Sequence, residues 1–167
     1  MLKNGATLVR IAIGSDEQTH LTAAVVGELR RRGHSLLPFG PLAADLTGIP
    51  QPVTPEDQWP AVARAVAEAV AAGQTDEGIL FCWTGTGVSI AANKIPGIRA
   101  ALCDDAETAR GARLWNNANV LCLSLRRASK AVAQEILDAW FDTSFIPNQA
   151  DNACLAQLEA IEKVYAK

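Results

Sequence analysis

The chain has 167 residues, 49% of them hydrophobic, which suits one compact domain with a sizeable core. Its formal net charge of -3 gives no broad attraction for nucleic acid or for an anionic membrane, so a small-molecule function is expected. Residues 1–8 lack the apolar segment of a secretory signal, and no stretch reaches the roughly 18 uncharged apolar residues of a membrane span. We expect a cytoplasmic protein with no nucleic-acid partner and no membrane partner.

The first half of the chain alternates apolar runs with helical patterns. Residues 8–13 are predicted to form a buried strand that ends at Gly14-Ser15-Asp16, and apolar residues then recur at helical spacing up to Gly33. A weaker strand at 35–39 precedes a proline-rich segment, in which regular structure is not expected. The segment 60–72 predicts a helix that stops at Gly73.

The second half continues the alternation. It predicts strands at 78–82, 98–103 and 118–123, and helices at about 86–94, 105–114, 128–141 and 153–165. About five strands alternating with helices indicate a Rossmann-like α/β fold, a doubly wound parallel sheet flanked by helices, in a single domain spanning 1–167. Ligands of such sheets bind beyond the carboxyl ends of the strands, where Asp16, Cys82 and the segment after Cys103 fall.

The cysteines and histidines exclude two kinds of site. The four cysteines form no C-x-x-C pair, and a chain of this size without a secretory signal is not expected to carry a disulfide framework. Cys103 and Cys122 lie among apolar neighbours and favour core filling, and Cys154 is predicted to pack in a helix. His20 and His34 have no ligand-like spacing, so no metal site is predicted.

Cys82 differs from the other cysteines in its position. It ends a predicted strand and directly precedes a glycine-rich turn that opens a helix. Backbone N–H groups at a helix start can hold an oxyanion, and the positive end of the helix can lower the pKa of a thiol. The alternatives are an inert core cysteine and a turn of purely structural role. The position favours a reactive thiol.

Three motifs carry a family resemblance: CWTGTGVSIAANK at 82–94, PGIRAALC at 96–103 and NNANVL at 116–121. Together they resemble the sugar-phosphate isomerases of the ribose-5-phosphate isomerase B and galactose-6-phosphate isomerase family. The resemblance implies an aldose–ketose isomerase, an intramolecular oxidoreductase that moves a proton between C1 and C2 through a cis-enediolate without a metal or organic cofactor. It also implies a homodimer or homotetramer with shared active sites, with the helix at about 151–167 at the interface.

The resemblance assigns roles residue by residue. Cys82 matches the family's base and is grouped with Thr84 as catalytic, because proton abstraction beside a carbonyl needs a base and a nearby oxyanion site. Asp16 matches an aspartate that binds sugar hydroxyls, although helix N-capping alone would explain it. Asn116 matches a substrate contact in an active-site loop. The substrate-binding turn comprises Trp83, Gly85, Thr86, Gly87 and Ser89.

Several positions depart from the family pattern. Glu17 stands where members have a phosphate-binding histidine, and Trp115 replaces the histidine that opens the sugar ring. Trp83 replaces a glycine, and Ala150 and Cys154 fall where members have two arginines. A carboxylate repels a phosphate, whereas aromatic faces pack on sugar C–H surfaces.

These departures change the expected substrate. They predict a small sugar or sugar phosphate other than ribose 5-phosphate, facing Glu17 and Trp115, with Arg113 or Arg126 as replacements for the missing charge. The alternative is a non-catalytic sugar-binding or partner subunit of a hetero-oligomeric isomerase, since galactose-6-phosphate isomerase is built from two different chains of the family. Retention of Cys82 with its whole glycine turn favours an enzyme.

Overall fold

The computed structural model describes residues 8–44 and 54–165. Within them, five parallel strands form one sheet in the order β2-β1-β3-β5-β4. The strands are β1 Arg10–Ser15, β2 Ser35–Phe39, β3 Glu77–Cys82, β4 Ala100–Leu102 and β5 Val120–Ser124. The predicted doubly wound α/β fold is confirmed.

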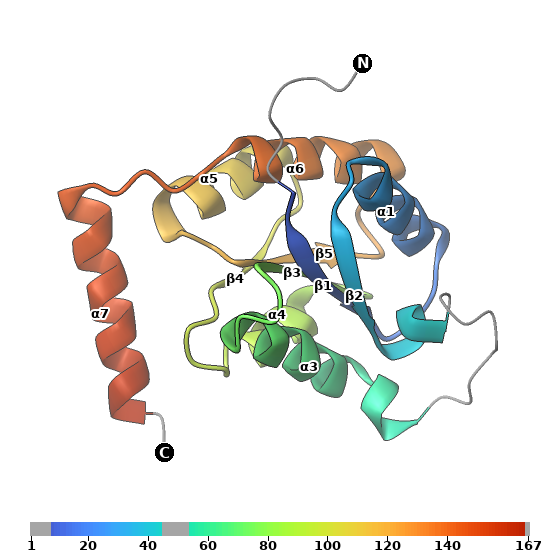
Figure 1. The fold of residues 1–167 in the computed structure, drawn as a ribbon, viewed down its shortest axis with the longest axis horizontal. Coiled ribbons are helices and arrows are strands. Elements are labelled where there is room, and N and C mark those ends of the chain that lie inside the picture. The colour runs from blue at the N-terminus through green and yellow to red at the C-terminus, as the bar shows by residue number, and fades with distance from the viewer. Residues whose placement is uncertain (1–7, 45–53, 166–167) are drawn as a thin grey trace.

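Helices cover both faces of the sheet (Figure 1). One face carries α1 His20–Arg31, α5 Ala106–Asn116 and α6 Lys130–Asp142, and the other carries α3 Trp59–Ala71 and α4 Thr86–Ala92. The proline-rich segment, expected to be irregular, contains two short 3-10 turns, Gly40–Ala43 and Pro55–Asp57, on either side of the undescribed residues 45–53. No helix in the described residues is long and apolar enough to cross a membrane.

The core lies in two layers, one on each side of the sheet. Ile11, Ile13 and Phe81 pack under α1, α5 and α6, whereas Ala12 and Leu80 pack under α3 and α4. Alternating side chains of each central strand are therefore buried on opposite faces, which is why these strands are continuous apolar runs in the sequence.

The last helix, α7 Gln149–Tyr165, stands beside this body (Figure 1) and has no buried residue. It contacts the loop before β4, since the Glu162 carboxylate accepts a hydrogen bond of 3.0 Å from the Gly97 N–H. Cys154, which was expected to pack, is exposed. The large apolar side chains of α7 are also exposed: Leu158, Ile161, Val164 and Tyr165. An exposed apolar patch of this kind marks an interaction surface.

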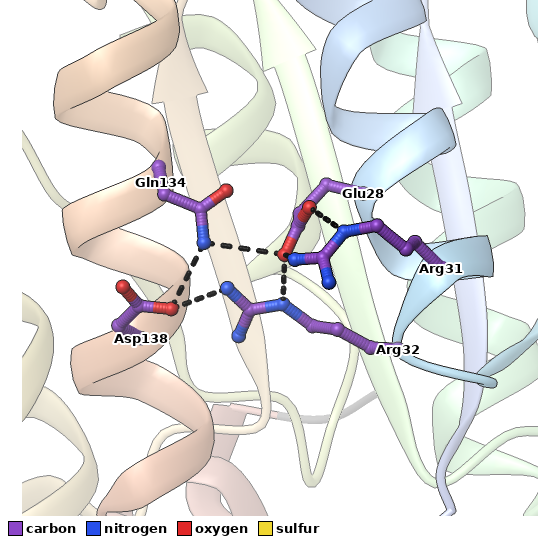
Figure 2. Close-up of polar contacts among 5 residues, drawn as sticks. All are labelled: Glu28, Arg31, Arg32, Gln134 and Asp138. Carbon is purple, nitrogen blue, oxygen red and sulfur yellow. Dashed lines mark hydrogen bonds and ion pairs between the residues drawn. The ribbon is translucent and has the colours of Figure 1, made fainter. Parts of the chain in front are cut away.

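A polar network fixes the end of α1 against α6 (Figure 2). Glu28 receives hydrogen bonds from Arg31, the last residue of α1, from Arg32, which directly follows it, and from Gln134 in α6. Arg32 also pairs with Asp138. Burial acts to raise the pKa of Glu28, but the hydrogen bonds from Arg32, Arg31 and Gln134 outweigh it and lower the pKa to about 2.

This network makes stability depend on acidity. The folded-state pKa lies below the ordinary value of 4.5, so the network contributes fully above that pH and loses its contribution as pH falls toward 2. We expect Glu28→Gln to lower the free energy of unfolding by about 2 kcal/mol at pH 7 and by much less near pH 2. Urea unfolding at several pH values measures the difference. Glu68→Gln, which breaks an exposed pair with Arg64, is the control and should cost no more than about 0.5 kcal/mol.

Candidate active site

The strand order places a switch point between β1 and β3. From β1 the chain first adds β2 on one side and later adds β3 on the other. Ligands of open α/β sheets bind at such a point, outside the carboxyl ends of the strands. Ser15 pairs with Phe81, so Asp16, directly after β1, and Cys82, the last residue of β3, lie at the same level of the sheet. Topology therefore brings together the two residues that the sequence placed at the carboxyl edge.

Cys82 is 5% exposed and is the last residue of β3. Its carbonyl accepts hydrogen bonds from the N–H groups of Gly85, at 3.2 Å, and Leu125, at 3.0 Å. Gly85 caps α4 with a φ of 75°, and a Cβ at this position would lie 2.5 Å from Leu102 Cδ1. Only glycine fits both the positive φ and the lack of space. The turn therefore leads directly from the thiol to the start of α4.

The rest of the turn is fixed by its backbone and exposes its side chains. The Trp83 carbonyl accepts hydrogen bonds of 3.0 Å from the Arg126 N–H and from Ser124 Oγ, while the Trp83 side chain is exposed. Thr84 and Thr86 are exposed, with their hydroxyl oxygens 2.7 Å apart. The turn after Cys82 thus presents hydroxyl groups and an aromatic ring to solvent.

The other strand cysteines belong to the core. Cys103 is 1% exposed and Cys122 is fully buried. Burial raises the pKa of Cys103 to about 12 and also raises that of Cys122, although a hydrogen bond with Ser89 opposes the second shift. Both remain protonated thiols at neutral pH, as expected for core filling. Ser89, predicted to bind substrate, lies against the Cys122 thiol.

Asp16 has an unusual environment. Its Oδ1 is buried and has no hydrogen-bond partner within residues 8–44 and 54–165, and burial raises the pKa of the carboxyl. Thr19 caps α1 by accepting from the Thr22 N–H, which removes N-capping as the explanation for Asp16. A buried acceptor without a protein donor is suited to a ligand hydroxyl. The exposed Glu17 follows, its carbonyl accepting from Ser15 Oγ at 2.7 Å.

Trp115 and Asn116 lie elsewhere. They end α5, and the Asn119 carbonyl just beyond accepts a hydrogen bond of 2.9 Å from the N–H of Gly78, near the start of β3. The end of α5 is therefore at the amino edge of the sheet, whereas Cys82 is at the carboxyl edge. The length of β3 separates them, about 17 Å at the usual rise of a strand. One copy of the chain does not bring these predicted site residues together.

Arg113 is engaged in structure, so it cannot replace a missing phosphate ligand. Its guanidinium pairs with Glu77 at 2.7 Å, donates to the Ala118 carbonyl at 2.7 Å and lies over the Trp140 ring. Trp140 Nε1 donates to Glu77 at 2.6 Å. Arg126 is exposed beside Trp83 and remains the candidate. Asn93 is structural too, since its amide spans from the Ser89 carbonyl to the Ala100 N–H.

The fold and the site define a class of protein: an α/β enzyme with a thiol and an unpaired carboxylate oxygen at the switch point of its sheet. A model of the Ribose/Galactose Isomerase family matches residues 11–158, and the chain belongs to this family. D-erythrulose-4-phosphate isomerase of Pectobacterium atrosepticum is 37% identical over 139 residues, which cover 83% of this chain and 86% of that protein. Ribose-5-phosphate isomerase B of Escherichia coli is 36% identical over 137 residues, covering 81% and 85%.

Solved structures agree. Ribose-5-phosphate isomerase B of Clostridium thermocellum gives a TM-score of 0.80 at 35% identity and covers 93% of this chain and 99% of its own. The enzyme of Mycoplasma genitalium, solved with bound ribulose-5-phosphate, gives 0.77 at 31% identity, covering 92% and 96%. The chain is therefore an aldose–ketose isomerase of a small sugar or sugar phosphate.

Proposed function

We propose that this isomerase acts on a four-carbon sugar or sugar phosphate, with Cys82 as the base that moves the proton. The observation that carries the proposal is the placement of Cys82 and the unpartnered Oδ1 of Asp16 at the carboxyl ends of the neighbouring strands β3 and β1. The thiol supplies the proton acceptor, and the carboxylate oxygen accepts a substrate hydroxyl. The sugar is thereby oriented over the thiol.

The reaction balances without a cofactor. The Cys82 thiolate takes the proton from C2 of the aldose, the C–H electron pair forms the C1=C2 bond, and the carbonyl pair moves to O1. The thiol then returns the proton to C1, while the hydroxyl proton of O2 passes to O1 and leaves the carbonyl at C2. The Thr84 hydroxyl and the first amides of α4 face the developing oxyanion. Those amides precede the first intrahelical bond, from Ser89 N–H to the Gly85 carbonyl.

Trp115 supports a substrate that needs no ring opening. Indole is neither an acid nor a base near neutral pH, so it cannot assist the opening of a cyclic pentose. A four-carbon sugar 4-phosphate has its O4 esterified and cannot close a five-membered ring, so it stays acyclic. The Pectobacterium relative is named for such a compound.

We also propose that a second copy of the chain completes the site. Trp115 and Asn116 lie at the opposite edge of the sheet from Cys82, and the apolar side chains of α7 are exposed. A neighbouring copy in a homodimer or homotetramer would bring its amino edge to this carboxyl edge and cover α7. The free thiols of Cys82, Cys103 and Cys122 suit a reducing cytoplasm.

The test is a kinetic comparison of D-erythrulose 4-phosphate, D-erythrulose, ribose 5-phosphate and ribose. We expect kcat/KM for a four-carbon compound to exceed that for ribose 5-phosphate at least tenfold, with ribose 5-phosphate below about 10⁴ M⁻¹s⁻¹. A higher value for ribose 5-phosphate than for both four-carbon compounds would refute the proposed substrate. Binding without turnover of any compound would instead indicate a partner subunit.

A further inference from the structure

Trp59 lies at the proposed site although it is remote from Cys82 in the sequence. It is the first residue of α3, which runs from the carboxyl edge of the sheet back toward the amino edge, so its first turn stands beside the first turn of α4. A Cβ built on Gly87 would lie 3.0 Å from Trp59 Cε3 and 3.1 Å from Cδ2. The indole therefore covers the bare backbone of Gly87.

This contact leaves part of the indole available to a ligand. Trp59 is 40% exposed, and Trp83, which directly follows Cys82, is 57% exposed. Both tryptophans come from segments that end or begin at the carboxyl edge of the sheet, one in α3 and one in the turn after β3. Aromatic faces pack well against the C–H surfaces of a sugar, and a bulky ring also occupies volume that a longer chain would need.

We propose that Trp59 is a specificity-determining residue, a wall of the substrate site that rests on Gly87 and favours a four-carbon chain over longer sugars. The inference rests on the proposed function, because it takes the substrate to bind between Cys82 and the first turn of α4. Gly87 acts with Trp59, since a Cβ at this position would require the indole to shift by a few tenths of an ångström. The wall consists of one residue from α3 and one from α4.

Substitutions at both positions test the wall. Trp59→Ala should lower kcat/KM for D-erythrulose 4-phosphate about tenfold and raise the ratio of ribose 5-phosphate to D-erythrulose 4-phosphate activity at least tenfold. Gly87→Ala should shift the same ratio in the same direction, because its Cβ moves the ring by a few tenths of an ångström. The two changes should be non-additive, so the double variant resembles Trp59→Ala alone. Trp59→Phe should keep most of the selectivity.

The controls separate a wall from a structural role. Ile90→Ala removes an exposed apolar side chain of α4 and should leave the ratio unchanged. A merely structural effect of Trp59→Ala would lower kcat/KM for all sugars equally. The ratio of ribose 5-phosphate to D-erythrulose 4-phosphate activity would then stay unchanged, and the inference would be overturned.

A binding measurement distinguishes this failure from failure of the proposed function. The ratio of affinities is measured by calorimetry in a Cys82→Ala background, where turnover is not needed. If the wild type lacks turnover but Trp59→Ala still shifts the affinity ratio, the wall stands and the catalytic proposal fails. An affinity ratio that does not move, or no sugar binding at all, contradicts the wall.

Discussion

Cys82→Ala is expected to lower kcat/KM by about 10³-fold or more, which is the range that a positioned general base contributes. The loss follows from the position of Cys82. It is the last residue of β3 at the switch point, at the same level as Asp16, and it directly precedes the turn before α4. In the proposed reaction Asp16 and the turn hold the substrate, whereas Cys82 is the group that exchanges the carbon-bound proton. Substrate-dependent exchange of deuterium from solvent into C1 or C2, followed by NMR, is the direct measurement.

Two matched cysteines control for loss of fold. Cys103→Ala and Cys122→Ala remove buried core side chains and leave small cavities, so they should cost stability, on the order of 1 kcal/mol, and leave exchange largely intact. Cys82→Ser keeps the shape of the side chain and should be as inactive as Cys82→Ala. If exchange persists in a folded Cys82→Ala protein, another group is the base.

The fold was largely predictable because each element depends on local signals. Buried strands such as 78–82 are continuous apolar runs, and turn glycines such as Gly85 are needed by both φ and space. The strand order was not predictable from such signals. It places β4 at the edge beyond β5, and it brings Asp16 beside Cys82 through a pairing across more than sixty residues.

The candidate site was predictable only in part. The motif around Cys82 is contiguous, so the sequence reveals it directly, whereas Trp59 reaches Gly87 only through the packing of α3 on α4. The sequence does not reveal that Arg113 is held by Glu77 and Trp140, because both partners are distant from it in the sequence. The sequence predicts that Cys154 packs in a helix, but no part of the described chain buries α7. Amphipathicity predicts burial without telling which chain provides it.

Two inactive variants are expected to restore activity when they share an oligomer. Cys82→Ala damages the carboxyl edge, and Asn116→Ala damages the amino edge, about a strand length away. If each site combines the carboxyl edge of one copy with the amino edge of another, a mixed dimer has one site with both lesions and one with neither. Random assortment makes half of the dimers mixed, so a co-expressed pair should recover about a quarter of wild-type activity.

The matched control pairs two lesions of the same edge. Asp16, directly after β1, and Cys82, at the end of β3, lie at the same carboxyl edge of one copy, so in a mixture of Asp16→Ala and Cys82→Ala every site of a mixed dimer carries one lesion. This pair should stay inactive, whereas the Cys82→Ala and Asn116→Ala pair should recover activity. The two chains carry different tags, so that mixed oligomers can be purified. Each single variant must first be shown to be folded and oligomeric by circular dichroism and light scattering. If purified mixed dimers of Cys82→Ala and Asn116→Ala are inactive, the two edges do not form one site across copies. Only sites shared between copies would give a mixed dimer one site without either lesion.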